Sequence, residues 1–193
     1  VVPNTKWKKK FIGQNWYLGE TLHSGIGQGY FQSTPLQLCL MTAQIANGGY
    51  KIYPKLVMNE ASSEKLDKYV PLYENSKNIK IIQDAMFSST NEVMGTSYRS
   101  RIDDIKYQFA GKTGTAQVKK ITEKDRELDL KTFEIPYEER DHALYVAFGP
   151  YKQPRYALSI LVEHGGNGST TAAPMAKELF KLIIDRHELR AVS

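Results

Sequence analysis

Mostly apolar residues recur at the spacing of an amphipathic helix in three stretches of the chain. The first begins after Thr34, which forms a capping box with Gln37, and it stops at Asn47-Gly48-Gly49. We expect this helix to lie in the core. The second ends near Gly95, and the third is expected to cover one side of a sheet. The recurring positions are Leu36, Leu40, Met41, Ala43 and Ile45, then Ile81, Ile82, Ala85, Met86, Ser89 and Val93, and finally Ala172, Ala176, Leu179, Phe180, Ile183 and Ile184.

Three apolar runs predict strands, at residues 107–118, 142–150 and 155–164. The last two are joined by a proline-flanked, hairpin-like turn at 150–154. Because these strands lie close together in the sequence, we expect an α+β fold in which an antiparallel sheet is covered by helices. Two shorter runs, at 50–57 and 69–73, contain prolines, which would limit them to sheet edges.

The remaining segments show no sustained hydrophobic period. Residues 1–31 are rich in glycine toward their end, and we expect an irregular loop that leads into the first helix. Residues 119–141 are rich in charged side chains, and we expect a long exposed connection. No apolar run approaches the length of a membrane span, and there is no signal-peptide pattern.

The length of 193 residues suffices for one domain with its own core. Part of the net charge of +5 comes from four lysines between positions 6 and 10, interleaved with Trp7 and Phe11. Such a cluster can contact nucleic acid or anionic lipid. A solvated loop with one buried aromatic ring explains it more simply, and no nucleic-acid motif occurs elsewhere. We therefore expect no nucleic-acid partner.

Cys39 is the single cysteine, so no internal disulfide can form. Its apolar surroundings predict a small buried side chain rather than a reactive thiol. The four histidines are scattered along the chain without a ligand spacing, so we predict no metal site and no cofactor.

The sequence FAGKTGTAQ, at residues 109–117, combines a lysine, two threonines and small residues, and two chemistries require such a combination. A phosphate-binding loop would need a glycine at position 106, where Lys106 stands, and the residues that follow resemble a strand. The alternative is the K-T-G motif of serine acyl transfer. On an edge strand, Lys112, Thr113 and Thr115 can bind a substrate carboxylate, while Gly114 leaves room for a peptide backbone.

Five separated stretches together resemble the C-terminal part of class B penicillin-binding proteins, and most of all the elongation transpeptidases of the penicillin-binding protein 2 type. These stretches are WYLGETLHSGIGQGYFQSTPLQLCLMTAQIANGGY, GTSYRSR, FAGKTGTAQV, HALYVAFGPY and EHGGNGSTTAAPMAKEL. The resemblance covers nearly the whole chain except residues 57–80 and 119–141. It is far more specific than the three residues of the K-T-G motif alone.

This resemblance implies an antiparallel sheet between helices and a D,D-transpeptidase that cross-links peptidoglycan stem peptides through a serine acyl-enzyme. β-Lactams would acylate the same serine. Lys112, Thr113 and Thr115 would hold the terminal carboxylate, and the backbone N–H of Thr115 would donate into the oxyanion hole, a role worth about 3 kcal/mol. Gly114 would give the substrate backbone access.

The nucleophile is harder to place. Ser62 and Lys65 fit S-x-x-K, and Ser76 and Asn78 fit S-x-N, but we interpret both matches as accidental. Residues around Ser62 are charged, whereas a lysine that acts as a base must be desolvated. Only 14 positions separate the two serines, and the family places both serine motifs before its GQGY…TPLQL stretch, which opens this chain.

We therefore expect residues 1–193 to be the C-terminal portion of one transpeptidase domain, with the nucleophile and a membrane anchor upstream, and to be inactive alone. Expected partners are the stem peptide, β-lactam antibiotics, the remainder of its own domain and elongation-complex proteins, at the periplasmic side of a bacterial inner membrane. Arg99 and Arg101 remain without an assigned role. Two alternatives stay open: a non-catalytic peptide-binding module that keeps the K-T-G strand, and a phosphate-loop nucleotidase.

Overall fold

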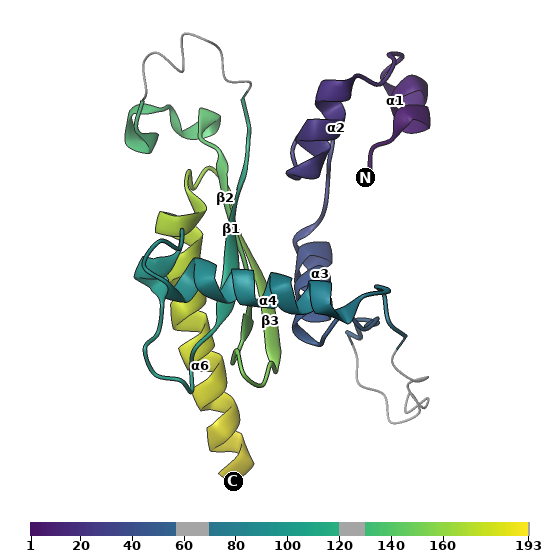
Figure 1. Ribbon diagram of the computed structural model, residues 1–193. Coiled ribbons are helices and arrows are strands. Elements are labelled where there is room, and N and C mark those ends of the chain that lie inside the picture. Colours follow the sequence, from purple (N-terminus) through teal and green to yellow (C-terminus); the bar gives the residue numbers. More distant parts are fainter. Residues whose placement is uncertain (57–69, 120–129, 193) are drawn as a thin grey trace. The chain divides into compact units, whose positions relative to one another are not determined.

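The computed structural model describes residues 1–56, 70–119 and 130–192 (Figure 1). The chain divides into two compact units, Val1–Gln37 and Leu38–Ser193. The larger unit holds the whole sheet and the K-T-G segment, so the site is built within it.

The smaller unit corrects the expectation of an irregular segment at residues 1–31. It contains helix α1 (Thr5–Phe11) and helix α2 (Leu18–Gly25). The side chain of Asn4 accepts a hydrogen bond from the Trp7 N–H at 2.9 Å, and Glu20 accepts one from the Tyr17 N–H at 2.8 Å. Local capping therefore forms both helices without a broad apolar face.

The basic cluster near the start of the chain is helical rather than a loop. Lys8 is only 1% exposed, and its Nζ donates to the Asn15 carbonyl oxygen at 2.8 Å and pairs with the carboxylate of Glu20. The ring of Tyr17 lies 4.5 Å from the same ammonium group. One of the four lysines thus stabilises the unit internally, while Lys6, Lys9 and Lys10 are not buried.

Helix α3 (Pro35–Ala46) follows the sequence prediction closely. The predicted capping box is present, since Thr34 Oγ1 accepts from the Gln37 N–H at 3.2 Å and Gln37 Oε1 accepts from the Thr34 N–H at 2.9 Å. Gly48 and Gly49 both take positive φ where the helix stops. The expected core role holds only in part, because Ile45 is buried but Leu36 and Met41 are exposed.

Helix α4 (Ser76–Asn91) starts earlier than predicted, where Asn75 accepts a hydrogen bond from the Lys77 N–H. Its predicted apolar face is partly wrong. Met86 is buried, but Ile81, Ile82 and Val93 are exposed, and Ile79 and Thr90 are the other buried residues of this helix. The buried face is therefore rotated relative to the face that the apolar residues define.

The three predicted strands form one antiparallel sheet in the order β1-β2-β3: β1 (Ala110–Ala116), β2 (His142–Gly149) and β3 (Tyr156–Val162). This confirms the predicted α+β architecture. The two shorter runs do not form strands in the described residues, where only a bridge joins Tyr50 to Pro71. Residues 57–69 and 120–129 lie outside the described part, so the expectations for them are not tested.

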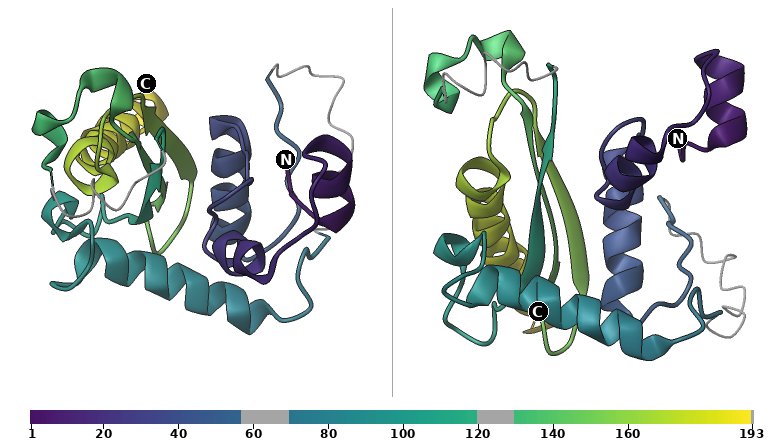
Figure 2. Two further views of the ribbon diagram at one scale, coloured as in Figure 1. Left: turned by 90° about the horizontal axis from the view of Figure 1, so that it is seen from above. Right: turned by 45° about the horizontal axis from the view of Figure 1, so that its top comes forward.

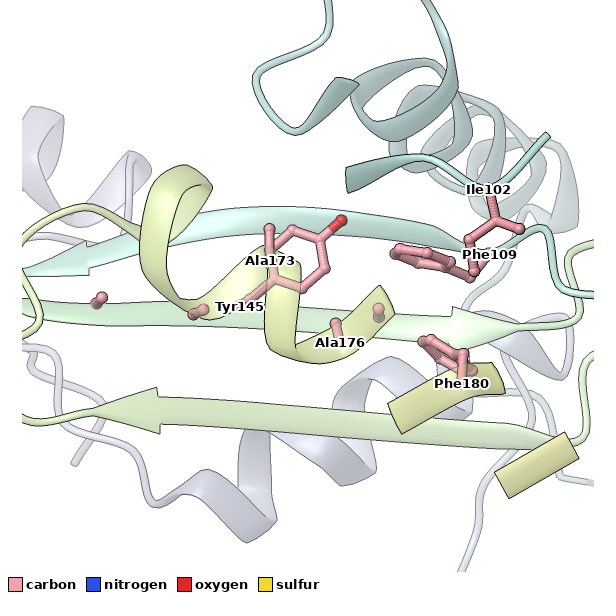
Figure 3. Packing of buried hydrophobic residues seen from close by; sticks show 9 residues of the cluster. Ile102, Phe109, Tyr145, Ala173, Ala176 and Phe180 are labelled. Atoms are coloured by element: carbon pink, nitrogen blue, oxygen red, sulfur yellow. The ribbon is translucent and has the colours of Figure 1, made fainter. Parts of the chain in front are cut away.

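Helix α6 (Ala173–Val192) lies against one face of the sheet (Figure 2), after a π-helical turn, η5, at Gly168–Ala172. Figure 3 shows the core between them, where Phe109 stacks on Phe180 with ring centroids 4.9 Å apart. Of the predicted face of α6, Leu179 is exposed instead. The buried members of this core are Ile102, Phe109, Ala143, Tyr145, Ala147, Ala172, Ala173, Ala176 and Phe180.

A second, smaller cluster joins α3 and α4 to the sheet. It consists of Ile45, Met86, Ala110 and Phe148, which are all buried. The side chain of Asn91, at the end of α4, donates to the Phe109 carbonyl oxygen at 2.9 Å. Helix α4 is thus fastened beside the start of β1, just before the K-T-G residues.

Candidate functional site

Strand β1 carries the K-T-G residues and pairs only with β2 in the described sheet, so it is an edge strand. Thr113 and Thr115 lie opposite Tyr145 and Ala143, and residues opposite one another across antiparallel strands point to the same face. The two threonines therefore share one face, as their alternation predicts, and Lys112 starts from the other face.

The side chain of Lys112 nevertheless ends beside Thr113. Its Nζ donates to the Thr113 carbonyl oxygen at 2.9 Å and to Thr113 Oγ1 at 3.2 Å. Thr113 Oγ1 also lies 3.3 Å from Oγ1 of Thr96, in the connection between α4 and β1. Lys112 is exposed and Thr113 is half-buried. An ammonium group and a hydroxyl group thus meet at the strand surface, a combination suited to a carboxylate.

Gly114 is enclosed on its β2 side. A Cβ on Gly114 would lie 3.3 Å from Leu144 Cβ, and Gly168 packs so closely that a Cβ there would lie 2.7 Å from the Gly114 carbonyl oxygen. Access to the Gly114 backbone is therefore along the strand edge that faces away from β2.

A buried group of hydroxyls packs beside this part of β1, on the face that Thr113 shares with Tyr145. The Oη of Tyr145 lies 2.9 Å from Thr90 Oγ1 and 3.1 Å from Ser97 Oγ. Burial raises the pKa of the Tyr145 phenol, and the hydrogen bonds with Ser97 and Thr90 oppose that rise only in part. Tyr145 is therefore a neutral, fully buried anchor between α4 and the sheet.

Two open cavities adjoin the site and meet at Gly95 and Thr96, which line both. The first, of about 630 Å³, is lined by residues of mixed polarity that include Arg99 and Lys177. The second, of about 620 Å³, has Lys112 on its wall. Its other side chains are mostly apolar and include Met41, Ile45, Ile82, Met86, Met94 and Val146.

The other residues singled out from the sequence have surroundings of their own. Arg101 pairs with Asp103 and lies 4.1 Å from the ring of Tyr98. Ser76 and Asn78, which form the S-x-N match, are exposed in the first turn of α4. The S-x-x-K match at 62–65 lies outside the described residues.

Cys39 is half-buried rather than fully buried, with Sγ 3.4 Å from the Ala157 carbonyl oxygen, and burial raises the pKa of its thiol. Within the described residues, no cluster of three or more histidine, cysteine, aspartate or glutamate side chains could hold a metal ion. In the same residues, no helix is both long and apolar enough to span a membrane.

The sequence analysis did not predict the hydroxyl groups beside the motif, which belong to Ser89, Thr90, Thr96, Ser97 and Tyr145. The GTSYRSR stretch carried the resemblance to the family, but no role was inferred for its threonine. The available signal was weak, because a threonine and a serine after a helix are common in turns.

The chain belongs to the family of the penicillin-binding protein transpeptidase domain, which matches residues 4–181. Within it, the chain is similar to transpeptidases of the penicillin-binding protein 2 (PBP2) type. It is 32% identical over 192 residues to the peptidoglycan D,D-transpeptidase MrdA of Salmonella typhimurium. The aligned region covers 96% of this chain and 30% of that protein.

Two solved structures support the same relationship. PBP2 of Pseudomonas aeruginosa in complex with WCK 5153 superposes with a TM-score of 0.76 at 34% identity, over 94% of this chain and 37% of that one. PBP2 of Helicobacter pylori in complex with MreC superposes with a TM-score of 0.73 at 33% identity, over 98% of this chain and 31% of that one. The chain thus spans about a third of the length of the relatives it matches.

Proposed function

We propose that this chain forms the substrate-binding side of the active site of a peptidoglycan D,D-transpeptidase, with Lys112, Thr113, Gly114 and Thr115 as the site residues. The observation that carries the proposal is the meeting of the Lys112 ammonium group and the Thr113 hydroxyl at an exposed strand edge. The similarity to D,D-transpeptidases named MrdA supports the choice of reaction.

The proposed ligand is the C-terminal carboxylate of a stem peptide that ends in D-Ala-D-Ala. Lys112 supplies a positive charge, and the hydroxyls of Thr113 and Thr115 supply directed hydrogen bonds. The peptide backbone lies along the outer edge of β1 as an added strand. That arrangement brings the penultimate carbonyl to the backbone N–H of Thr115, which stabilises the developing oxyanion.

The serine and its lysine come from outside residues 1–193 in this proposal. The serine Oγ attacks the penultimate D-alanine carbonyl carbon, the C–N bond breaks, and terminal D-alanine leaves with the proton taken from the serine. An amine of a neighbouring stem peptide then attacks the ester and regenerates the serine. A penicillin acylates the same Oγ when its lactam C–N bond opens, so the full-length protein binds β-lactams and this chain alone has no acyl transfer.

The names of the relatives suggest the setting. PBP2 of Helicobacter pylori forms a complex with MreC. We propose an equivalent partner in an elongation complex for the full-length protein, which would be anchored in the inner membrane with this domain in the periplasm.

A fluorescent penicillin tests the proposal. We expect covalent labelling of the full-length protein and none of the 193-residue chain by itself. Lys112→Ala in the full-length protein should slow labelling strongly, whereas Lys152→Ala, an exposed lysine in the β2–β3 turn, should not. Labelling of the isolated chain would show that the nucleophile lies within it.

The same assay separates the alternative function. A non-catalytic peptide-binding module would leave the full-length protein unlabelled while it still bound a D-Ala-D-Ala peptide. Equal labelling rates for Lys112→Ala and the unchanged protein would contradict the proposed role of β1.

A further inference from the structure

Four polar side chains form a continuous series from helix α4 to the K-T-G strand. Ser89 Oγ lies 3.2 Å from Thr96 Oγ1, Thr96 Oγ1 lies 3.3 Å from Thr113 Oγ1, and Lys112 Nζ lies 3.2 Å from the same Thr113 oxygen. These separations are at the long end for hydrogen bonds. The series therefore fixes the positions of the four groups, although each single contact is weak.

The number of hydrogen bonds that Thr113 can form gives this series a direction. A hydroxyl has one donor hydrogen and two acceptor lone pairs, and a lysine ammonium can only donate. Lys112 therefore occupies one lone pair of Thr113. If Thr96 donates to the second lone pair of Thr113, the single hydroxyl hydrogen of Thr113 has no acceptor within the series and points outward.

We propose that Thr96 is a positioning residue, which donates to Thr113 and so fixes the Thr113 hydroxyl as a donor to the substrate carboxylate. This inference rests on the proposed function, since it needs a carboxylate at β1. Ser89 completes the direction, because its hydroxyl can donate to Thr96 while Thr96 donates onward.

The connection that bears Thr96 is fixed on both sides. Gly95 lies against α4 so closely that a Cβ there would be 2.3 Å from the Ser89 carbonyl oxygen. The Ser97 N–H and Ser97 Oγ both donate to that same carbonyl oxygen at 3.0 Å, and Ser97 Oγ also contacts Tyr145. Thr96 is thus held between two anchored neighbours, so its side chain meets Thr113 at a set position.

A merely structural role for Thr96 is the competing explanation, since its contact with Ser89 also fastens the connection to α4. The two roles differ in what they couple. A positioning role requires the effect of Thr96 to pass through Thr113, whereas a structural role acts whether or not Thr113 keeps its hydroxyl.

A double-mutant cycle in the full-length protein tests this difference. The variants are Thr96→Val, Thr113→Val and both together, and the measurement is the second-order rate constant of acylation by a fluorescent penicillin. We expect Thr96→Val to slow acylation about tenfold, as for a lost hydrogen bond to a charged group. Thr96→Ser should keep the wild-type rate, because serine retains the hydroxyl. When Thr113 is already valine, the additional change Thr96→Val should not slow acylation further.

Benzylpenicillin and its methyl ester, used as competitors, give an independent measurement. The loss in Thr96→Val should be confined to the free acid, because the ester has no carboxylate to bind. Thr170→Val is the matched control, since Thr170 lines the same cavity as Thr96 and donates to the Asn167 carbonyl oxygen instead. Its acylation rate should be unchanged.

The positioning role would be overturned if Thr96→Val had the wild-type acylation rate. It would also be overturned if Thr96→Val slowed acylation as much in the Thr113→Val background as in the otherwise unchanged protein. If Thr96→Val fails to fold, the same cycle with Thr96→Ala decides the matter. If Lys112→Ala leaves acylation intact, the proposed function itself fails. If Lys112 and Thr113 variants are slow but Thr96→Val is normal, only the positioning role fails.

Discussion

The phenol of Tyr145 lies directly on the backbone of Gly111, one residue before the K-T-G motif. A Cβ on Gly111 would be 2.3 Å from Tyr145 Oη and 2.5 Å from Cζ. Both residues are buried, and Figure 3 shows the ring reaching from β2 toward β1. The glycine therefore lets an aromatic side chain of the neighbouring strand brace β1 where the site begins.

We predict that Gly111→Ala destabilises the protein by about 1–3 kcal/mol, because the added methyl group must displace a buried and hydrogen-bonded ring. Thermal unfolding of the purified protein measures the loss. Gly19→Ala is the matched control, since nothing lies within 4 Å of a Cβ there and the position is in helix α2. That control should be neutral or slightly stabilising. Equal melting temperatures for the two variants would contradict the packing argument.

Tyr145→Phe keeps the ring but removes a hydroxyl that both Thr90 and Ser97 contact. We expect a loss of about 1 kcal/mol in unfolding free energy, as for a typical buried hydrogen bond. The loss is not larger because Ser97 keeps its bond to the Ser89 carbonyl oxygen. Chemical denaturation checks this, with Tyr53→Phe as an exposed control. A Tyr145→Phe protein as stable as the control would show that the hydroxyl contributes nothing.

The same phenol makes the stability depend on alkaline pH. Burial raises the pKa of Tyr145 in the folded state above the value of about 10 in an unfolded chain. Above that pH the unfolded chain loses its proton first, so the unfolded state binds fewer protons and stability falls as pH rises. Below pH of about 9 the group has no such effect. We predict that the stability gap between wild type and Tyr145→Phe narrows as pH rises from 9 to 11, and a constant gap would contradict this.

The sequence predicted the elements whose signals are local. The capping box of Thr34 and Gln37 forms as expected, because both partners lie within one helical turn. Strands β2 and β3 were predicted because each is a short, mostly apolar run bounded by turn residues, although no residue of β3 is fully buried. The position of Lys112 on an edge strand also followed from the sequence, as the motif itself requires a free edge.

The elements that the sequence missed depend on contacts between distant residues. Helix α1 has seven residues and buries only Lys8, and helix α2 has eight residues and buries none, so both are too short to show a sustained apolar period. Thr96 and Thr113 are 17 positions apart, and nothing in either segment indicates that their hydroxyls meet. The face of α4 was misassigned because tertiary packing buries Thr90 and leaves Ile81 in solvent.

Gly168 links the last helix to the site, and its replacement should affect both stability and acylation. A Cβ on Gly168 would lie 2.4 Å from the Leu144 carbonyl oxygen and 2.7 Å from that of Gly114. Both obstacles are backbone atoms of paired strands, so Gly168→Ala must push the turn away from β1 or bend the strand.

We expect Gly168→Ala to lower the unfolding free energy by about 1–3 kcal/mol and to slow penicillin acylation of the full-length protein. Gly25→Ala provides the control, because no atom lies within 4 Å of a Cβ at that position. Measurement of both quantities separates two outcomes. A loss of stability with normal acylation would mean that the turn yields and β1 keeps its shape, whereas slower acylation places the strain in the K-T-G strand itself. An unchanged protein in both assays would contradict the close packing of Gly168 on Gly114.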